Sequence, residues 1–319
     1  MFQLVASGAV RDELYLVNGV TYIEGDLKLM HLRILLAIMA HLQRAIQYKI
    51  SHRRRPPDQL LPPDRVISIP VSSIVIGKKN TSRLRSYLQE LCTCPVIFPE
   101  QHAFSGLIAG FDFPMYAKTI SISLPKELMG RLLLTKEGYT CVSYSGSTML
   151  TNKYTVRLYW LICAWRNRGG FVISVSEFRR ILCLSSSYSR FDNIVSRILA
   201  PSEKELESRF PIWFRYRLYD TDDARKLVFK IHLRISEDER KKAMSTAWDY
   251  CFNLLSSAGA HLTTIQDIFA RLDYEDLRPF TEKLHSLTTH IRTHRIAAPD
   301  RYIRTVMDTW FSSWLERYK

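Results

Sequence analysis

The chain has 319 residues, of which 46% are hydrophobic, and a formal net charge of +14 at pH 7. This basic excess favours a polyanionic partner such as nucleic acid, although a charged surface also keeps proteins soluble. No apolar run approaches the roughly 20 residues of a transmembrane helix, no signal peptide is evident, and the six scattered cysteines are typical of reduced thiols in a cytoplasm. The length predicts two or three domains.

Residues 1–25 form an N-terminal segment without a clear pattern, and a long helix is predicted after it. Apolar residues recur there at spacings of three and four. We expect this helix to run from Leu27 to about Gln47, with Asp26 as its N-cap. A Pro-rich loop then precedes a strand, a short helix, a turn, a second helix, further strands and another short helix, predicted at 65–70, 71–76, 77–80, 81–92, 96–124 and 126–134.

The same order of elements returns between Asn152 and Arg234. A long helix with an apolar stripe comes first, and a Ser-rich turn precedes another helix that begins near Tyr188. The remaining elements are a strand, a short helix and a closing β hairpin, predicted at 171–173, 175–182, 211–218 and 226–234. Helix, strand, helix, turn, helix and hairpin is the order of a winged helix-turn-helix, which is a DNA-reading module.

The repeated order predicts an α+β, mainly helical fold with two tandem winged helix-turn-helix domains and a helical C-terminal extension. In the extension, Ser236 and Glu239 have the spacing of a capping box, and four helices are predicted, at 237–257, 262–271, 274–288 and 299–317. The domain plan is an N-terminal segment, a first winged helix, a linker, a second winged helix that is the main DNA reader, and the extension, at residues 1–25, 26–137, 138–151, 152–235 and 236–319.

The helix after Tyr188 carries the clearest DNA-binding pattern. Its apolar face consists of Phe191, Ile194, Val195, Ile198 and Leu199, and its opposite face of Ser189, Asn193, Arg197, Ala200 and Lys204. A helix in a major groove needs such a polar and basic face, backed by a core face. We expect Arg197 to contact guanine or phosphate, Asn193 to contact adenine and Arg190 to contact phosphate. An ordinary solvated helix face is the alternative.

Pro201 interrupts this helix, because it lacks a backbone donor and crowds the preceding turn. Ser202 and Glu205 have capping-box spacing, so the helix could restart there. We therefore expect a kink at Pro201, with base contacts before it and packing after it.

Two further basic clusters are candidates for phosphate contacts. The hairpin carries Arg215, Arg217, Arg225 and Lys226, which suit the DNA backbone beside a groove or, alternatively, a solvated strand face. In the first half, the turn and the start of the second helix carry Lys78, Lys79, Asn80, Arg83 and Arg85. Helix N-termini favour phosphate, and added cations strengthen that preference. The Gly-rich nucleotide-binding loop pattern fails here because position 72 is Ser.

Signals for catalysis and metal binding are poor. An origin nickase would need two histidines flanking one residue, and no such pattern occurs. His290 and His294 are four residues apart without an acidic or cysteine partner nearby, which favours a surface pair over a metal site. We therefore expect no catalytic residue, no metal and no cofactor.

The chain resembles the plasmid replication initiators that bind iterons through two winged-helix domains. The resemblance covers roughly residues 26–235 and is carried by segments 29–47, 154–159, 173–182, 197–201, 203–206 and 225–229, together with Tyr188 and Phe191. It implies binding of direct repeats at a replication origin, melting of adjacent A·T-rich DNA and recruitment of host replication factors such as a helicase or its loader. It also implies dimers through the first domain that repress the initiator's own gene, and no bond-changing catalysis.

We therefore predict a sequence-specific, double-stranded DNA-binding initiator of plasmid replication that is not an enzyme and is found in the bacterial cytoplasm with the plasmid. A winged-helix transcriptional regulator, acting as an autorepressor, is the first alternative. An origin nickase with a catalytic tyrosine is the second, since the chain has 16 tyrosines.

Overall fold

The computed structural model describes residues 12–53, 65–74, 81–99, 102–133, 138–220, 225–294 and 296–318. Their contacts divide the chain into two compact units. The first unit holds the residues up to Ala164 together with Ser176–Glu205, and the second holds Trp165–Val175 together with the residues from Leu206 onward. None of the helices in the described ranges is long and apolar enough to cross a membrane.

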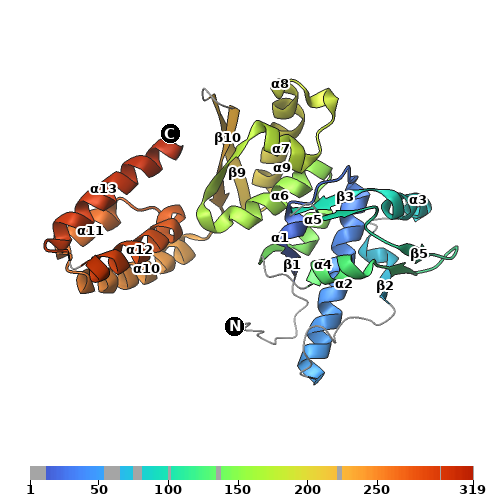
Figure 1. The fold of residues 1–319 in the computed structure, drawn as a ribbon, viewed down its shortest axis with the longest axis horizontal. Helices are drawn as coiled ribbons and strands as arrows, with labels where there is room; N and C mark the ends of the chain where they lie inside the picture. Colours follow the sequence, from blue (N-terminus) through green and yellow to red (C-terminus); the bar gives the residue numbers. More distant parts are fainter. Residues whose placement is uncertain are drawn as a thin grey trace. The chain divides into compact units, whose positions relative to one another are not determined.

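The part of the first unit before residue 150 contains the first predicted winged helix together with elements of the N-terminal segment and of the predicted linker (Figure 1). Its helices are α1 (Asn18–Thr21), α2 (Leu29–Arg53), α3 (Thr81–Thr93), α4 (Lys126–Leu133) and α5 (Tyr144–Met149). Its strands are β1 (Glu13–Val17), β2 (Val66–Pro70), β3 (Val96–Phe98), β4 (His102–Phe104), β5 (Gly110–Asp112), β6 (Thr119–Ser123) and β7 (Tyr139–Ser143). The predicted strand at 65–70, the helices at 81–92 and 126–134 and strands within 96–124 are present, with ends that differ by a few residues. The short helix predicted at 71–76 is instead a single 3-10 turn, Val71–Ser73, and residues 75–80 lie outside the described residues.

A three-stranded antiparallel sheet in the order β2-β6-β5 forms the β part of this winged helix. Its register pairs Ile67 with Ile122 and Ile69 with Ile120, and all four side chains are buried. Alternation of buried and exposed residues along β2 follows from the two-residue period of a strand. The wing is the hairpin of β5 and β6.

The long helix α2 starts two residues later than predicted, and Asp26 does not cap it. The N–H of Leu27 donates to the carbonyl of Gly25 at 2.7 Å, which turns the chain before the helix begins. The Asp26 carboxylate instead accepts a hydrogen bond from Lys153 at 2.8 Å. The capping prediction was wrong because a partner distant in sequence binds this side chain.

Strand β1 pairs antiparallel with β7, so the N-terminal segment and the predicted linker lie side by side. Residues 138–151 also contain α5, whose N-cap Ser143 accepts from the N–H of Gly146. The linker prediction therefore missed an ordered part of the fold that the sequence pattern did not reveal.

The second winged helix is divided between the two units. Its helices are α6 (Lys153–Trp165), α7 (Val175–Leu182), α8 (Phe191–Ile194) and α9 (Ala200–Arg209). Its strands are β8 (Gly170–Ser174), β9 (Ile212–Asp220) and β10 (Arg225–Leu233), in the sheet order β8-β10-β9. The last strand lies between the other two, as it does in the first winged helix. The repeated element order predicted from the sequence thus corresponds to a repeated sheet topology.

Four helices follow the second sheet: α10 (Glu237–Ser257), α11 (Leu262–Ala270), α12 (Leu277–His294) and α13 (Pro299–Tyr318). The predicted capping box is present, because Ser236 and Glu239 exchange side-chain and backbone hydrogen bonds. The helices share a core that includes Leu255, Phe280 and Ile303, all fully buried. Residues 236–319 contain twelve Lys and Arg and twelve Asp and Glu, so the positive excess of the chain lies before this helical extension.

Candidate nucleic-acid interface

The recognition helix, defined here as residues 191–209, follows α7 through a tight turn. Cys183 adopts a positive φ of 49°, and the N–H of Leu184 donates to the carbonyl of Arg179 at 3.0 Å to end α7. The guanidinium of Arg179 then donates to the carbonyl of Ser189 at 2.6 Å, just before the next helix. This bond connects the two helices of the helix-turn-helix and fixes where the recognition helix begins.

The inner face of the recognition helix is the predicted apolar face. Ile194, Ile198 and Leu199 are fully buried, and Phe191 and Val195 are partly buried. Burial of three such aliphatic side chains stabilises the helix by several kcal/mol, at about 1.5–3 kcal/mol each. The outer face is therefore the one turned to solvent.

The outer face is polar and basic. Arg197, Ala200 and Lys204 are exposed, and Arg190 precedes the helix as an exposed residue. Arg190 lies 3.5 Å from the carboxylate of Asp192, an exposed ion pair of a kind that contributes little to stability. Within the described ranges, Arg197 and Lys204 form no hydrogen bond or ion pair through their side chains.

Asn193 and Ser189 are the two remaining residues of the predicted face. Asn193 is only partly exposed, and its backbone N–H donates to the carbonyl of Arg190 at 3.2 Å. Ser189 is exposed. Sequence reasoning did not include Ser196, which is also exposed; its hydroxyl donates back to the carbonyl of Asp192 at 2.8 Å.

A single π-helical turn, Val195–Leu199, lies in the middle of the recognition helix. Pro201 follows it and cannot donate to the carbonyl four residues back, so the turn before it widens. The helix nevertheless continues through Pro201 to Arg209. A widened turn thus lies directly before the predicted kink at Pro201, and such turns recur at functional sites.

The predicted helix restart at Ser202 and Glu205 was wrong. The hydroxyls of Ser202 and Thr155 share a buried hydrogen bond of 2.8 Å. The carboxylate of Glu205 accepts from the N–H and the hydroxyl of Thr151, at 3.3 and 3.2 Å. Both side chains therefore hold the recognition helix against the beginning of α6 rather than capping their own helix.

The wing of the second winged helix belongs to the second unit. In the pairing of β9 with β10, Arg217 lies opposite Val228, and Tyr219 lies opposite Lys226. Arg217, Arg225 and Lys226 are exposed. Arg215 is engaged by the carboxylate of Glu207 through two hydrogen bonds of 3.0 and 2.5 Å, and the pKa of Glu207 is lowered by this pairing. Arg215 is thus already engaged by an acidic side chain within the fold.

In the first winged helix, the predicted basic cluster is described in part. Arg83 and Arg85 are exposed on α3, near its N-terminal end. Arg85 also donates to the carbonyl of Phe113 in the wing. Lys78, Lys79 and Asn80 lie outside the described residues, so their predicted role as phosphate ligands stays a prediction.

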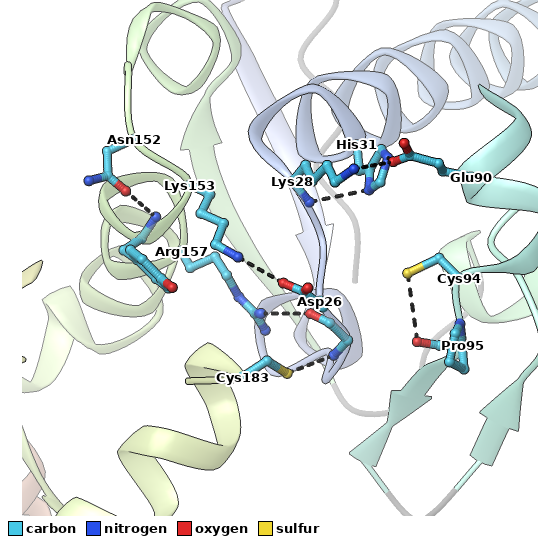
Figure 2. A network of polar contacts seen from close by, with 12 residues as sticks. Asp26, Lys28, His31, Glu90, Cys94, Pro95, Asn152, Lys153, Arg157 and Cys183 are labelled. Carbon is cyan, nitrogen blue, oxygen red and sulfur yellow. Dashed lines mark hydrogen bonds and ion pairs between the residues drawn. The ribbon is translucent and has the colours of Figure 1, made fainter. Parts of the chain in front are cut away.

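A buried arginine joins α6 to the chain segment Ile23–Asp26 within the first unit. Arg157 is 3% exposed, and its guanidinium donates to the carbonyls of Ile23 and Gly25. Figure 2 shows Lys153, Arg157 and Cys183 converging on the chain around Asp26. Burial lowers the pKa of Arg157, and the hydrogen bond from Lys153 lowers that of Asp26.

The same segment is held by α7. Arg180 pairs with Glu24, and the N–H of Gly25 lies 2.9 Å from the sulfur of Cys183. Sequence patterns alone singled out Arg157 only as part of the initiator-like motif, because neither its burial nor its partners can be inferred from local spacing. These contacts fix α6 and α7, on which the recognition helix packs, to the first winged helix.

The histidine pair of the extension is a stacked surface pair. The rings of His290 and His294 lie 4.1 Å apart between centroids, and both residues are exposed. Among the residues that the structure describes, no group of three or more His, Cys, Asp or Glu side chains is placed to hold a metal ion.

Two winged helices in tandem, the second with a basic, solvent-facing recognition helix, define a class of DNA-binding protein. Residues 174–232 match the family model described as "Initiator Rep protein, WH2". The match confirms the resemblance to replication initiators, which several segments within this range carry. The matched segment runs from β8 through the recognition helix to β10.

The solved structures agree on the fold. The Pi initiator protein in complex with iteron DNA matches with a TM-score of 0.53 and 16% identity, covering 70% of this chain and 98% of that chain. At this identity the match shows the shared fold, which confirms the predicted tandem winged-helix architecture. RctB domains 2 and 3 match with a TM-score of 0.34 and 11% identity, covering 67% and 86%; this likeness is too weak to argue from.

A sequence search of curated proteins gives no match. The family model and the Pi structure are both described as initiators.

Proposed function

We propose that this protein initiates plasmid replication by binding repeated double-stranded sites at the origin. Binding would promote melting of adjacent A·T-rich DNA and recruit host factors such as the replicative helicase or its loader. The protein would act in the bacterial cytoplasm, on the plasmid, without making or breaking covalent bonds. A homodimer through the first winged helix is part of this proposal.

The outer face of the recognition helix is the observation that carries the proposal. Arg197 and Lys204 project into solvent from a helix whose opposite face carries the fully buried Ile194, Ile198 and Leu199. Arginine can form a bidentate contact with guanine in the major groove, and lysine can contact phosphate. Arg217, Arg225 and Lys226 on the wing would add phosphate contacts, which position the protein without reading sequence. The family match over residues 174–232 supports the same assignment.

The decisive experiment measures binding of Arg197→Ala to a labelled duplex that carries one origin repeat. We expect a loss of about 1–3 kcal/mol in binding free energy and weaker discrimination against mutated repeats. Arg301→Ala, which removes an exposed arginine from the neutral extension, is the matched control and should bind normally. Unchanged affinity and discrimination for Arg197→Ala would remove the recognition helix from the interface.

Replacement of both Lys78 and Lys79 by Ala tests the first winged helix. If these residues contact phosphates, affinity should fall for every duplex sequence, and the slope of log K against log salt should become shallower. A loss confined to the cognate repeat would instead assign them to base reading.

Initiation can be separated from the two alternatives in cells and in solution. An initiator is required for replication of a plasmid that carries the origin, whereas an autorepressor is required only for control of its own promoter. Both strands of supercoiled origin DNA should remain covalently intact when the DNA is incubated with the protein and Mg²⁺ or Mn²⁺. Metal-dependent nicking would support the nickase.

A further inference from the structure

The tip of the first wing, residues 113–118 between β5 and β6, carries two large apolar side chains that are exposed to solvent. Met115 is 80% exposed and Tyr116 is 94% exposed. They are the two most exposed large hydrophobic residues in the described part of the chain. A scattered exposed apolar residue is ordinary, but two adjacent ones at the end of a hairpin form the outermost point of the wing.

The base of this tip is fixed to the rest of the winged helix. Arg85 on α3 donates to the carbonyl of Phe113, and its guanidinium lies 6.0 Å from the centre of the Phe113 ring. The Phe113 side chain itself is buried. The N–H of Ala117 closes the turn on the carbonyl of Pro114 at 3.2 Å, and the carbonyl of Lys118 accepts from the N–H of Val71 at 2.9 Å.

Tyr116 adopts a positive φ of 63°, a conformation that is uncommon for residues other than glycine and costs free energy for a bulky one. The turn therefore holds Met115 and Tyr116 outward even though no contact with the described residues rewards that position. Such pre-ordering lowers the entropic cost of inserting the two side chains into another molecule.

The charges around the tip favour an anionic occupant. Arg83 and Arg85 are exposed on the neighbouring α3, and Lys118 is exposed on the wing. Asp112 is the exposed acidic residue at the end of β5. Two side chains are also far fewer than the 20–30 residues a side that a stable protein interface of standard size employs. A wedge between DNA bases, in contrast, needs only one or two apolar side chains.

We propose that Met115 and Tyr116 form an apolar wedge that enters the minor groove of bound DNA and partly unstacks a base step. The proposal rests on the function proposed above and adds a physical means by which binding could begin to open the duplex. Pyrimidine–purine steps such as TA unstack most readily, so the wedge should act best where the DNA is rich in A and T.

The test uses the full-length protein and a duplex that carries a repeat selected by the wild-type protein from a random library. One strand contains 2-aminopurine at successive positions, whose fluorescence rises when a base unstacks, and the duplex ends carry a dye pair that reports bending. We expect the wild-type protein to raise the 2-aminopurine signal at one step and to bend the duplex. Met115→Ser with Tyr116→Ser should still bind the repeat but leave the signal near that of free DNA.

Two further variants serve as controls for the double variant. Tyr116→Phe keeps an aromatic wedge and should retain the signal, and Leu262→Ser, at an exposed apolar residue of the extension, should behave as wild type. If wild-type protein binds the duplex without unstacking it, or if the double variant unstacks and bends it equally, the wedge is overturned while the proposed function stands. If wild-type protein selects no duplex, both proposals fail.

Discussion

Helix α6 and the recognition helix each carry an arginine, but one points into the fold and the other points into solvent. Arg157 of α6 is buried and donates to the backbone carbonyls of Ile23 and Gly25. Arg197 of the recognition helix is exposed and forms no ion pair with a described residue. Residue type alone therefore does not assign a role in a basic protein. An arginine whose donors are occupied inside the fold stabilises it, whereas one left to solvent can bind a ligand.

The largest loss of stability is expected on replacement of the buried arginine. Arg157→Met should reduce the free energy of unfolding by about 2–4 kcal/mol, because two inward-facing carbonyls would lose their donor. Urea denaturation followed by circular dichroism measures this change. Arg180→Met, which removes the exposed pair with Glu24, is the control and should cost less than about 1 kcal/mol. Equal losses of unfolding free energy for the two variants would contradict the prediction that the buried Arg157 stabilises the fold more than an exposed ion pair does.

A second test compares the two faces of the recognition helix itself. Ser202→Ala would leave the buried hydroxyl of Thr155 without its partner and should cost about 1–3 kcal/mol of stability. Lys204→Ala, two residues further on the exposed face, should change stability by no more than about 0.5 kcal/mol. The same denaturation curves serve for both. A Lys204 variant as unstable as the Ser202 variant would contradict the assignment of inner and outer faces.

The wing should give a smaller effect, confined to binding. Arg217→Gln should lower affinity for cognate and unrelated duplexes alike, and reduce the slope of log K against log salt by about 1. Arg215→Gln is the matched change on the same strand. Because Arg215 is already paired with Glu207, it should alter the salt slope less. The proposed phosphate role of Arg217 fails if the two variants have the same slope.

The smallest effect concerns a buried histidine of α2. Burial lowers the pKa of His31 although Glu90 acts in the opposite direction, and Nδ1 accepts from the N–H of Lys28 at 3.2 Å. The unfolded chain therefore binds a proton at His31 more readily than the folded one. The contribution of His31 to the free energy of unfolding is complete above the ordinary histidine pKa of 6.5. It declines as the pH falls from there toward the lower pKa of His31 in the folded protein.

Unfolding midpoints in urea between about pH 7.5 and 5 test this prediction. His31→Gln should flatten the decline that is seen in the wild-type protein. A steeper decline in the variant would show that His31 is stabilised in its charged form by Glu90.

Local sequence patterns predicted this fold well where the forces are local. The helix Val175–Leu182 has the predicted ends, and the capping box of Ser236 with Glu239 is present, because both depend on residues within one or two helical turns. The apolar face of the recognition helix was likewise predicted from its spacing and is buried.

The errors share a physical cause, which is a partner far away in the sequence. The carboxylate of Asp26 accepts a hydrogen bond from Lys153, which is 127 residues later in the sequence. Ser202 is bonded to Thr155 across 47 residues, and β1 pairs with β7 at the other end of the first winged helix. Local rules assign caps and strands from neighbours alone, so they could not anticipate these contacts or the burial of Arg157.

The balanced charge of residues 236–319 has a practical consequence for work with this molecule. Four helices with their own interior and equal numbers of acidic and basic groups exert little long-range pull on a polyanion. A fluorophore or affinity label attached there would leave the ionic attraction of the remaining chain undisturbed. This part of the molecule is therefore the natural place for a reporter.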